Sequence, residues 1–388
     1  MQRTLSKERI PAPGIKNGLQ KTPCDTDNAR LQATVIDVAV KGLPAMFDEN
    51  SQLFCNRRIR TEKVGLIPEG LDYRYTIITL LGLHKYAASG GISPIDAQTT
   101  LQRLVESADT IKNCGDVGLL LWLCALADPL HLDFLYAKLG IANVFDNYPD
   151  ADAGYSMSLG WLLTGASYAA MAENPNPRWQ KLAEKTYQRL LENYHGKGIF
   201  RHQSPTTIKG FLRGRFGSFA DQVYPTYGLV AFATAFDNDE AINIASECAE
   251  TIIRHQGVLG QWWWQYNAAT GRKAGKYPVF ATHQNGMAPM MLFAAGKAAG
   301  EDFRPAIYKG LRWLDRKNEL GVNMIDADEH LIWRCIHKNP NQRYWDGFRA
   351  VLGLSTDIKH TELQVKFECR PYHLGWILYA FASESEIV

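Results

Sequence analysis

Two kinds of helical segment alternate along the chain. Segments of the first kind place apolar residues three and four positions apart with charged residues between them, as in LQRLVESADTIKN at residues 101–113. This period is typical of an amphipathic helix that covers a core. The others of this kind lie at residues 179–194, 239–256 and 304–317. Strand patterns are sparse, so we expect an all-α fold.

Segments of the second kind are apolar on nearly all sides and rich in small residues, which indicates buried helices. Each begins with a polar residue, as Asp72 begins the run DYRYTIITLLGLHKYAA. The others begin at Asp116, Asp152, Asp221, His283 and Arg370. Because the two kinds alternate, we expect a single (α/α)6 toroid, a barrel of six inner and about six outer helices.

A repeat of about 60 residues supports a series of helical hairpins. Gly198, Gly260 and Gly321 follow three of the amphipathic segments at intervals of 62 and 61 residues. Glycine is the expected stop just beyond a helix because it enters the left-handed region at little steric cost. No long linker follows, so we predict a loose N-terminal arm over residues 1–30 and one toroid domain over residues 31–388.

Composition and charge exclude several classes of protein. The chain has 42 Lys and Arg against 40 Asp and Glu, so no basic field favours nucleic acid. No apolar run reaches the roughly 20 residues of a membrane span, and the first 30 residues lack the apolar core of a signal peptide. Seven scattered cysteines without a CxxC pair are typical of reduced thiols in a core. We expect a cytoplasmic protein that binds no nucleic acid and has no membrane span.

The predicted toroid brings the starts of the inner helices to one mouth. Free N–H groups and the helix dipole make such a place favourable for anions and reacting carboxylates. Asp72, Asp152 and Asp221 are the candidate catalytic carboxylates, and His283 is a candidate base because imidazole titrates near neutral pH. The alternative is that each of these residues only caps its helix.

Aromatic residues crowd the loop at residues 260–267. Trp262, Trp263 and Trp264 are consecutive there, and a strand or loop does not bury all three on one face. We therefore expect at least one of them to face a groove, where indole rings stack on sugars or stabilise cations. The alternative is a hydrophobic plug that seals the toroid.

Basic residues suggest an anionic ligand. Arg213 and Arg215 lie in a Gly-rich loop and could bind a carboxylate or phosphate in a bidentate way, and Tyr224 lies one turn beyond Asp221. The alternative is a solvated basic loop. The remaining candidate binding residues are Arg74, Arg334, Arg370 and His373.

The histidines lack the HxH, HxxxH and HExxH spacings of metal sites. We expect no metal and no other cofactor, and an anionic small molecule or oligosaccharide as substrate. The pattern leaves the oligomeric state open.

The alternation of six inner and six outer helices resembles the six-hairpin glycosidase superfamily, which includes unsaturated glucuronyl hydrolases, glucosamine 2-epimerases and all-helical polysaccharide lyases. The run Asp152-Ala-Gly-Tyr is similar to the Asp-x-Gly-Phe opening of an inner helix in glucuronyl hydrolases, where the aspartate is catalytic. Residues 216–228 resemble a run of the toroid lyases, with Asp221 or Gln222 where the lyases have histidine.

This resemblance implies a carbohydrate-active enzyme, of the hydrolase, lyase or epimerase type, that acts on an acidic or uronate-containing sugar. Asp152 and Asp221 would then form the acid/base pair, because glycosyl chemistry uses two carboxylates with separated pKa values. His283 would be a reserve base for epimerisation or elimination.

A second resemblance implies different chemistry. Residues 256–262 and 309–321 are similar to the QW repeats of squalene–hopene-type terpene cyclases, and residues 149–153 (PDADA) to their Pro-Asp-x-Asp-Asp motif, with Ala153 in place of the last aspartate. Asp152 would then protonate an alkene in a class II terpene-cyclase-like enzyme. A third alternative is a non-catalytic toroid that serves as a binding module.

Overall fold

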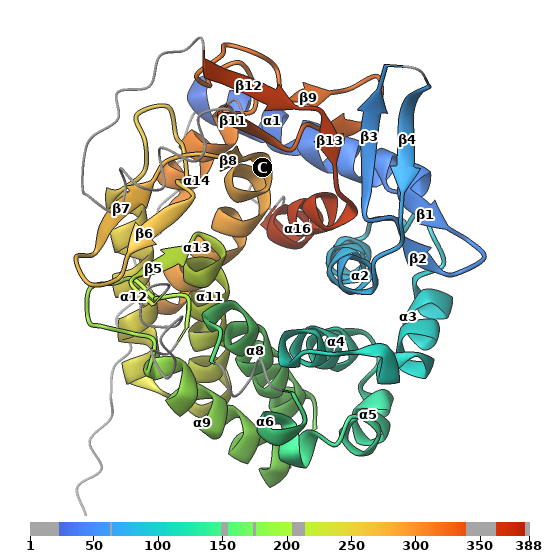
Figure 1. The fold of residues 1–388 in the computed structure, drawn as a ribbon, viewed down its shortest axis with the longest axis vertical. Helices are drawn as coiled ribbons and strands as arrows, with labels where there is room; N and C mark the ends of the chain where they lie inside the picture. The colour runs from blue at the N-terminus through green and yellow to red at the C-terminus, as the bar shows by residue number, and fades with distance from the viewer. Residues whose placement is uncertain are drawn as a thin grey trace, which may run out of the picture.

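Among the described residues, six inner helices surround a common axis, as the apolar segments predict (Figure 1). The structure is a computed structural model that describes residues 23–62, 64–148, 154–173, 176–203, 214–338 and 362–384. The inner helices are α2 (Tyr73–Ala88), α4 (Cys114–Ala127), α8 (Ser156–Ala172), α11 (Ala220–Phe236), α13 (Ala288–Ala299) and α16 (Pro371–Phe381). The predicted all-α toroid is confirmed.

Outer helices alternate with the inner helices along the chain and form a second ring around them (Figure 1). Most of an outer helix's contacts are with the inner helix before it, as α9 packs mainly against α8. The outer helices are α1 (Pro23–Gly42), α3 (Ala97–Glu106), α5 (Leu132–Lys138), α9 (Pro177–Leu191), α12 (Asp239–Arg254) and α14 (Arg304–Arg312). Helix α9 shows why they lie outside, because it buries Trp179, Leu182, Ala183, Thr186, Tyr187 and Leu190, which share one helical face. Helix α1 begins at Pro23, and the division at residue 30 stays a prediction.

Short turns of other helix types complete the helical part. The α-helical turn is α6 (Val144–Asn147), and the π-helical turn is η5 (His283–Met287), which leads into α13. The 3-10 turns are η1 (Pro44–Met46), η2 (Ala108–Thr110), η3 (Pro129–His131), η4 (Ile141–Asn143) and η8 (Ala382–Glu384).

The inner helices pack so closely that glycines form the contacts. Every residue of α4 from Cys114 to Ala125 is buried. A Cβ on Gly82 of α2 would lie 2.1 Å from the carbonyl oxygen of Gly375 in α16. A Cβ on Gly165 of α8 would lie 2.2 Å from the carbonyl oxygen of Gly118 in α4. The small residues noted in the apolar segments therefore allow the ring to close.

Aromatic side chains fill the barrel axis toward the C-terminal ends of the inner helices. The ring of Trp122 lies 5.1 Å from that of Tyr227, 5.1 Å from that of Tyr379 and 5.7 Å from that of Tyr168. Tyr227 shares hydrogen bonds with the hydroxyls of Tyr168 and Tyr379 at 3.0 and 2.7 Å. This cluster forms a floor, whereas partly exposed side chains such as Arg74 and Tyr155 lie at the N-terminal ends of the inner helices, which we call the mouth of the barrel.

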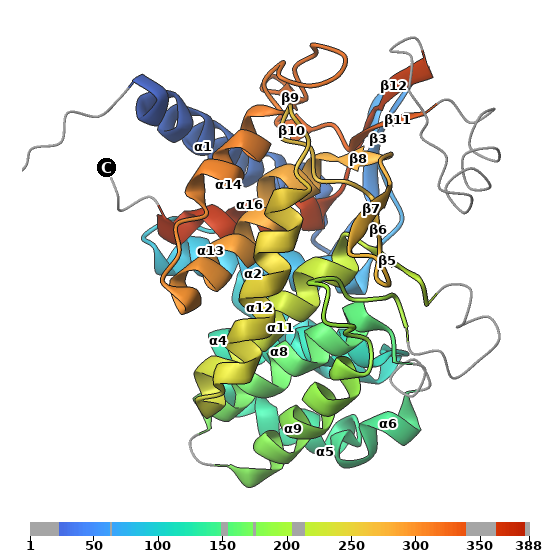
Figure 2. The ribbon, with the colours of Figure 1, turned by 90° about the vertical axis from the view of Figure 1, so that its left-hand side faces the viewer.

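The described strands are short, and those in the three-stranded sheets precede inner helices (Figure 2). Strand β3 (Arg57–Thr61) pairs with β4 (Gly65–Glu69) and β13 (Glu368–Cys369), and β6 (Gln265–Asn267) pairs with β5 (Phe216–Ser218) and β7 (Arg272–Gly275). Strand β11 (Cys335–Lys338) pairs with β8 (Val279–Phe280) and β12 (Leu363–Lys366). Two hairpins pair β1 (Phe47–Asp48) with β2 (Leu53–Phe54) and β9 (Ile325–Asp326) with β10 (Leu331–Ile332). Strands of two to five residues are too short to show alternation in the sequence.

The repeated glycines adopt left-handed backbone conformations but do not end the helices. Gly198, Gly260 and Gly321 have φ values of 64°, 93° and 64°, whereas α9, α12 and α14 end six to nine residues earlier. A Cβ on Gly198 would meet Thr251 of α12, and one on Gly260 would meet the carbonyl of Lys309 in α14. The expectation of a helix stop was therefore wrong, and two of these glycines allow a loop to lie against the next outer helix.

Within the part of the chain that the structure describes, no helix combines the length and the apolar character that crossing a membrane requires. Among the described residues, the buried cysteines Cys55, Cys124, Cys248, Cys335 and Cys369 are free thiols.

Candidate active site

Asp72 stands at the start of α2 as a helix cap. Its Oδ1 accepts a hydrogen bond from the backbone N–H of Tyr75 at 3.0 Å, and its Oδ2 accepts one from Asn56 at 2.9 Å. One oxygen thus caps the N-terminus of α2, and the other holds the preceding loop. The contacts match the capping alternative for this candidate catalytic residue.

Arg74, one of the candidate binding residues, forms an ion pair that joins α2 to the neighbouring inner helix α4. Its Nη2 donates to Oδ2 of Asp116 at 3.2 Å, and its Nε donates to Oδ1 of the same carboxylate. Asn113, which caps α4, donates to Asp116 at 2.6 Å. The Arg74 guanidinium also lies over the ring of Trp161, 5.4 Å from its centre. Asp116 thus holds Arg74 at the mouth of the barrel.

A cluster of cations surrounds Glu368 where β13 leads into α16. The Glu368 side chain has no exposed area, and its oxygens accept from Arg334, from Arg370 at 2.9 Å, from Lys366 at 2.9 Å and from Arg57 at 3.3 Å. Arg57 also pairs with Glu69 at 2.7 Å. Four cations therefore share two carboxylates, which leaves a formal charge of +2. We call these six residues the Glu368 cluster.

Ion pairing determines the charge state of Glu368. Burial alone raises the pKa of this carboxyl, but hydrogen bonds from Arg334 and Lys366 outweigh that effect and lower the pKa to about 2. The carboxylate is therefore ionised at neutral pH and keeps the guanidinium groups of Arg334 and Arg370 in place.

Aromatic rings lie next to the two arginines of the Glu368 cluster. The Arg370 guanidinium lies 5.6 Å from the centre of the Tyr75 ring and donates to the Tyr75 hydroxyl. Tyr75 in turn lies 4.5 Å from the ring of Tyr372. The Arg334 guanidinium lies 5.3 Å from the ring of Phe280. These side chains are all partly exposed, so cations and ring faces meet at one surface.

Asp221 is paired with a histidine that the sequence analysis did not single out. Oδ2 of Asp221 lies 3.1 Å from Nδ1 of His202 and accepts from the backbone N–H and the hydroxyl of Ser218, both at 2.8 Å. The Asp221 side chain is 1% exposed and that of His202 is 34% exposed. His202 is therefore the exposed member of the pair, and its ring lies 5.2 Å from that of Tyr155.

The three tryptophans divide between core and surface. Trp262 and Trp263 are buried, and Trp263 donates to the carbonyl of His255 at 2.8 Å. Trp264 is partly exposed, and its ring stacks on that of His283 with centres 6.1 Å apart. Trp264 is thus the least buried of the three, and the expectation that it faces a groove stays a prediction.

His283 lies inside the wall of the mouth. Its imidazole is 3% exposed and lies 4.5 Å from Phe219 and 5.1 Å from Phe280, between ring centres. Burial lowers the pKa of His283 to about 3, so the ring is neutral at neutral pH. Among the described residues its Nδ1 has no hydrogen-bond partner.

His373 and Tyr224 are likewise buried near the mouth. Nε2 of His373 lies 2.9 Å from Oδ1 of Asn285, and burial lowers the pKa of His373 to about 3. Tyr224 is 4% exposed, and its ring lies 4.6 Å from that of Trp161. Both support the walls of the mouth rather than its surface.

The other candidate residues lie at the edge of the described chain. Arg215 is exposed directly before β5, and Asp152, Arg213 and the run PDADA at residues 149–153 lie outside the described residues. Among the described residues, no three His, Cys, Asp or Glu side chains come together as a metal ion would require.

His202 and Glu368 are absent from the residues predicted from the sequence, because their roles depend on partners that are distant in the chain. His202 is a lone histidine in a loop. A backbone hydrogen bond from its N–H to the carbonyl of Phe216 at 3.1 Å holds it beside Asp221. A local signal for Glu368 does exist, because positive and negative side chains alternate in the run Lys366-Phe367-Glu368-Cys369-Arg370.

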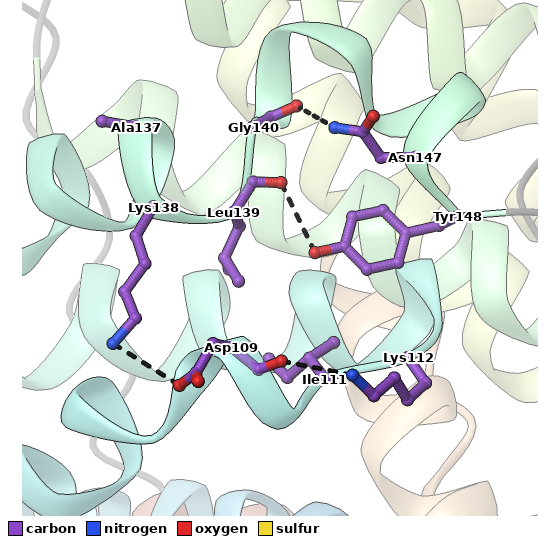
Figure 3. A pocket seen from close by; sticks show the side chains of 9 residues that line it. All are labelled: Asp109, Ile111, Lys112, Ala137, Lys138, Leu139, Gly140, Asn147 and Tyr148. Carbon is purple, nitrogen blue, oxygen red and sulfur yellow. Dashed lines mark hydrogen bonds and ion pairs between the residues drawn. The ribbon is translucent and has the colours of Figure 1, made fainter.

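An open hollow of about 670 Å³ lies at the rim, between the loops that lead into α4 and α8 (Figure 3). Lys138 faces Asp109 across it at 3.7 Å, and the Tyr148 hydroxyl donates to the carbonyl of Leu139 at 3.4 Å. Neither the Glu368 cluster nor the Asp221–His202 pair lines this hollow, so it is separate from the candidate site.

Solved structures share this fold over nearly the whole chain. No family model and no curated protein matches the sequence. An unsaturated glucuronyl hydrolase specific for heparin gives a TM-score of 0.59 at 14% identity and covers 94% of this chain and 98% of its own. A possible GH105 member from Salmonella enterica serovar Paratyphi A gives 0.60 at 12% identity, with coverages of 97% and 99%.

A sugar epimerase from a ruminal bacterium is also similar, with a TM-score of 0.59, 10% identity and coverages of 93% and 100%. At these identities the likeness concerns the fold. The chain therefore has the α/α-toroid architecture of these sugar-active proteins, as the resemblance of its helix pattern implies.

Proposed function

We propose that this chain is a carbohydrate-active enzyme that acts on an acidic, uronate-type sugar at the mouth of the toroid. One observation carries the proposal: the Glu368 cluster places an excess of positive charge beside ring faces at the open end of the barrel. A sugar carboxylate needs the charge, and the apolar face of a sugar ring needs the aromatic surface.

The arginines of the cluster are suited to bind a carboxylate. Arg334 and Arg370 are partly exposed, and both are oriented by the buried Glu368 carboxylate. A guanidinium that is already fixed loses little freedom when it binds a planar anion in a bidentate way. Tyr75 and Phe280, which lie beside the two guanidinium groups, supply the adjoining ring faces.

Proton transfer is assigned to His202 and Asp152. A buried carboxylate beside an imidazole fixes the orientation of the ring, which suits His202 to take a proton from water or from a sugar carbon. Asp221 is then a positioning residue. Asp152, whose role comes from its similarity to the catalytic aspartate of glucuronyl hydrolases, is the proposed second acid/base group.

The reaction type follows from where the proton is taken. If His202 activates water, the enzyme is a hydrolase. If it removes a proton from the carbon next to the sugar carboxylate, the same arginines stabilise the charge that develops there, as a lyase or epimerase requires. The similar structures include hydrolases and an epimerase, so both kinds of product belong in the test.

The proposal extends to the compartment and to the ligand. The five free, buried thiols named above for the described residues fit a reducing, cytoplasmic environment. One similar structure, at 12% identity, is a complex with the saccharide dGlcA-Glc-Rha-Glc, and an acidic oligosaccharide of this kind is the ligand proposed for this chain. The terpene-cyclase and binding-module alternatives stay predictions.

The test is a screen of wild type, Asp152→Asn and Arg334→Gln against unsaturated uronides, saturated uronides and polyprenyl compounds, with products identified by mass spectrometry. Turnover of a uronide that both substitutions reduce at least about 100-fold supports the proposal. Turnover of a polyprenyl compound, or equal activity of wild type and Asp152→Asn on the uronide, overturns it. Lys181→Gln, on the outer face of α9, is the matched control for the lost positive charge.

A further inference from the structure

The β5–β6–β7 sheet leaves one face open beside the candidate site. Tyr266 of β6 is fully buried and lies 6.5 Å from Phe219, so its side of the sheet rests on the barrel wall. Residues directly opposite each other share a face, and the register pairs Phe216 with Asn267 and Asn267 with Arg272. Because side chains alternate along a strand, these three lie on the side away from Tyr266. We call this side the open face.

The open face begins at the candidate site. Ser218 ends β5, lies opposite Gln265, and holds Asp221 through its N–H and hydroxyl at 2.8 Å. The row Phe216–Asn267–Arg272 lies two residues farther along the strands, which is about 7 Å at the usual rise. A chain of sugars leaving the mouth at Ser218 would therefore pass Gln265 first and Arg272 next.

The sheet carries positive charge without any acidic residue. Residues 214–218 and 265–277 contain Arg215, Arg272, Lys273 and Lys276, and neither segment contains Asp or Glu. Arg215, Arg272 and Lys273 are exposed and Lys276 is partly exposed. Such a surface attracts a polyanion.

The chemistry of the open face suits a sugar chain. Phe216 offers a partly exposed ring, Gln265 an amide that can donate and accept, and Arg272 a guanidinium for a carboxylate. Asn267 is already used, because its Oδ1 accepts from the N–H groups of Ala269 and Thr270 at 3.0 and 3.2 Å. These two hydrogen bonds hold the backbone of the turn that precedes Arg272.

We propose that the open face of the β5–β6–β7 sheet binds the further units of an acidic oligosaccharide whose terminal unit occupies the mouth. This inference rests on the proposed function and names the length and charge of its substrate: a chain of several carboxylate-bearing sugars rather than a disaccharide. The guanidinium of Arg272 binds a sugar carboxylate, and Gln265 binds sugar hydroxyls between Arg272 and the mouth.

The experiment measures binding rather than turnover, so that it is independent of the catalytic assignment. Fluorescently labelled galacturonate disaccharide and hexasaccharide are titrated with wild type, with Gln265→Ala/Arg272→Gln and with Gln180→Ala/Lys181→Gln. The last pair likewise removes one side-chain amide and one positive charge, at exposed positions of α9. A labelled neutral glucose hexasaccharide tests the requirement for charge.

The expected result is that wild type binds the hexasaccharide about tenfold or more tightly than the disaccharide, with a difference that shrinks as salt is added. The Gln265→Ala/Arg272→Gln variant should lose this length preference, and the α9 variant should keep it. Equal affinity of wild type for both lengths, or an undiminished preference in Gln265→Ala/Arg272→Gln, overturns the inference alone. If neither acidic probe binds wild type, the proposed acidic-sugar function fails with it.

Discussion

Nδ1 of His202 lies 3.1 Å from Oδ2 of Asp221, although the two residues are 19 positions apart. The pair is asymmetric, because the carboxylate is 1% exposed and the imidazole is 34% exposed. Ser218 binds the carboxylate from the other side with two hydrogen bonds of 2.8 Å. The buried carboxylate therefore fixes the imidazole, and the imidazole is the part of the pair that a substrate can reach.

Asp221→Asn should lower kcat on a uronide substrate by about 10²–10⁴-fold and change KM little, because the amide no longer holds the imidazole in the same orientation and tautomer. A lower kcat at an unchanged KM separates this effect from a loss of packing at the mouth, which would weaken substrate binding as well. Asp239→Asn, at an exposed position in the first turn of α12, is the control and should retain wild-type kinetics. A folded Asp221→Asn variant with wild-type kcat would contradict the role of the pair.

Glu368→Gln should lower the free energy of unfolding by about 3–5 kcal/mol, because removal of one partner leaves the surrounding cations without their buried counter-ion. Urea denaturation at neutral pH measures the change. The matched control is Glu69→Gln, since Glu69 pairs with the same Arg57 but is 40% exposed. The control should cost no more than about 1 kcal/mol, and equal effects of both substitutions would show that the cluster does not depend on Glu368.

Acid should begin to destabilise the protein below about pH 6.5, where unfolded histidine takes up a proton. Burial lowers the pKa of His283 and His373 to about 3 in the folded chain. Between pH 6.5 and 3 the unfolded state therefore binds more protons than the folded state. The contribution of the two histidines to the free energy of unfolding is fully present above this window and falls as the pH decreases through it. Each histidine contributes up to about 1.4 kcal/mol per pH unit.

His373→Asn removes one of these groups and should reduce the loss of stability between pH 7 and pH 5 by about 1–2 kcal/mol. Urea midpoints of wild type and variant across this range give the two slopes. Identical slopes would mean that His373 is not held neutral. Glu368 acts in a lower window, because its pKa of about 2 makes its contribution present above its usual pKa and lost only as the pH falls toward 2.

Gly82→Ala should destabilise the ring closure by at least about 2–3 kcal/mol, because the new Cβ would lie 2.1 Å from the carbonyl oxygen of Gly375 and both groups belong to packed helices. Thermal unfolding measures the effect. Gly300→Ala is the comparison: Gly300 has a φ of 73° but open space around it, so only the backbone cost of about 1 kcal/mol applies. A smaller loss for Gly82→Ala than for Gly300→Ala would contradict the close packing.

The partial success of the candidate list has a physical explanation. Residues at the starts of inner helices were found from the sequence, since the end of an apolar run is visible locally. Their roles were not, because a role depends on neighbours. One oxygen of Asp72 caps α2 and the other accepts from Asn56. His283 is buried against Trp264, and Arg370 is partly exposed beside Tyr75.

The sequence by itself determined the alternation of inner and outer helices, the polar starts of the inner helices and the paucity of long strands. Periodicity and composition decide these within one segment. Only the tertiary structure decided that Arg57 reaches Glu368, 311 positions away, and that His202 meets Asp221. Closing the ring sets α16 against α2 through Gly82 and Gly375, and this closure brings together charges that no local pattern connects.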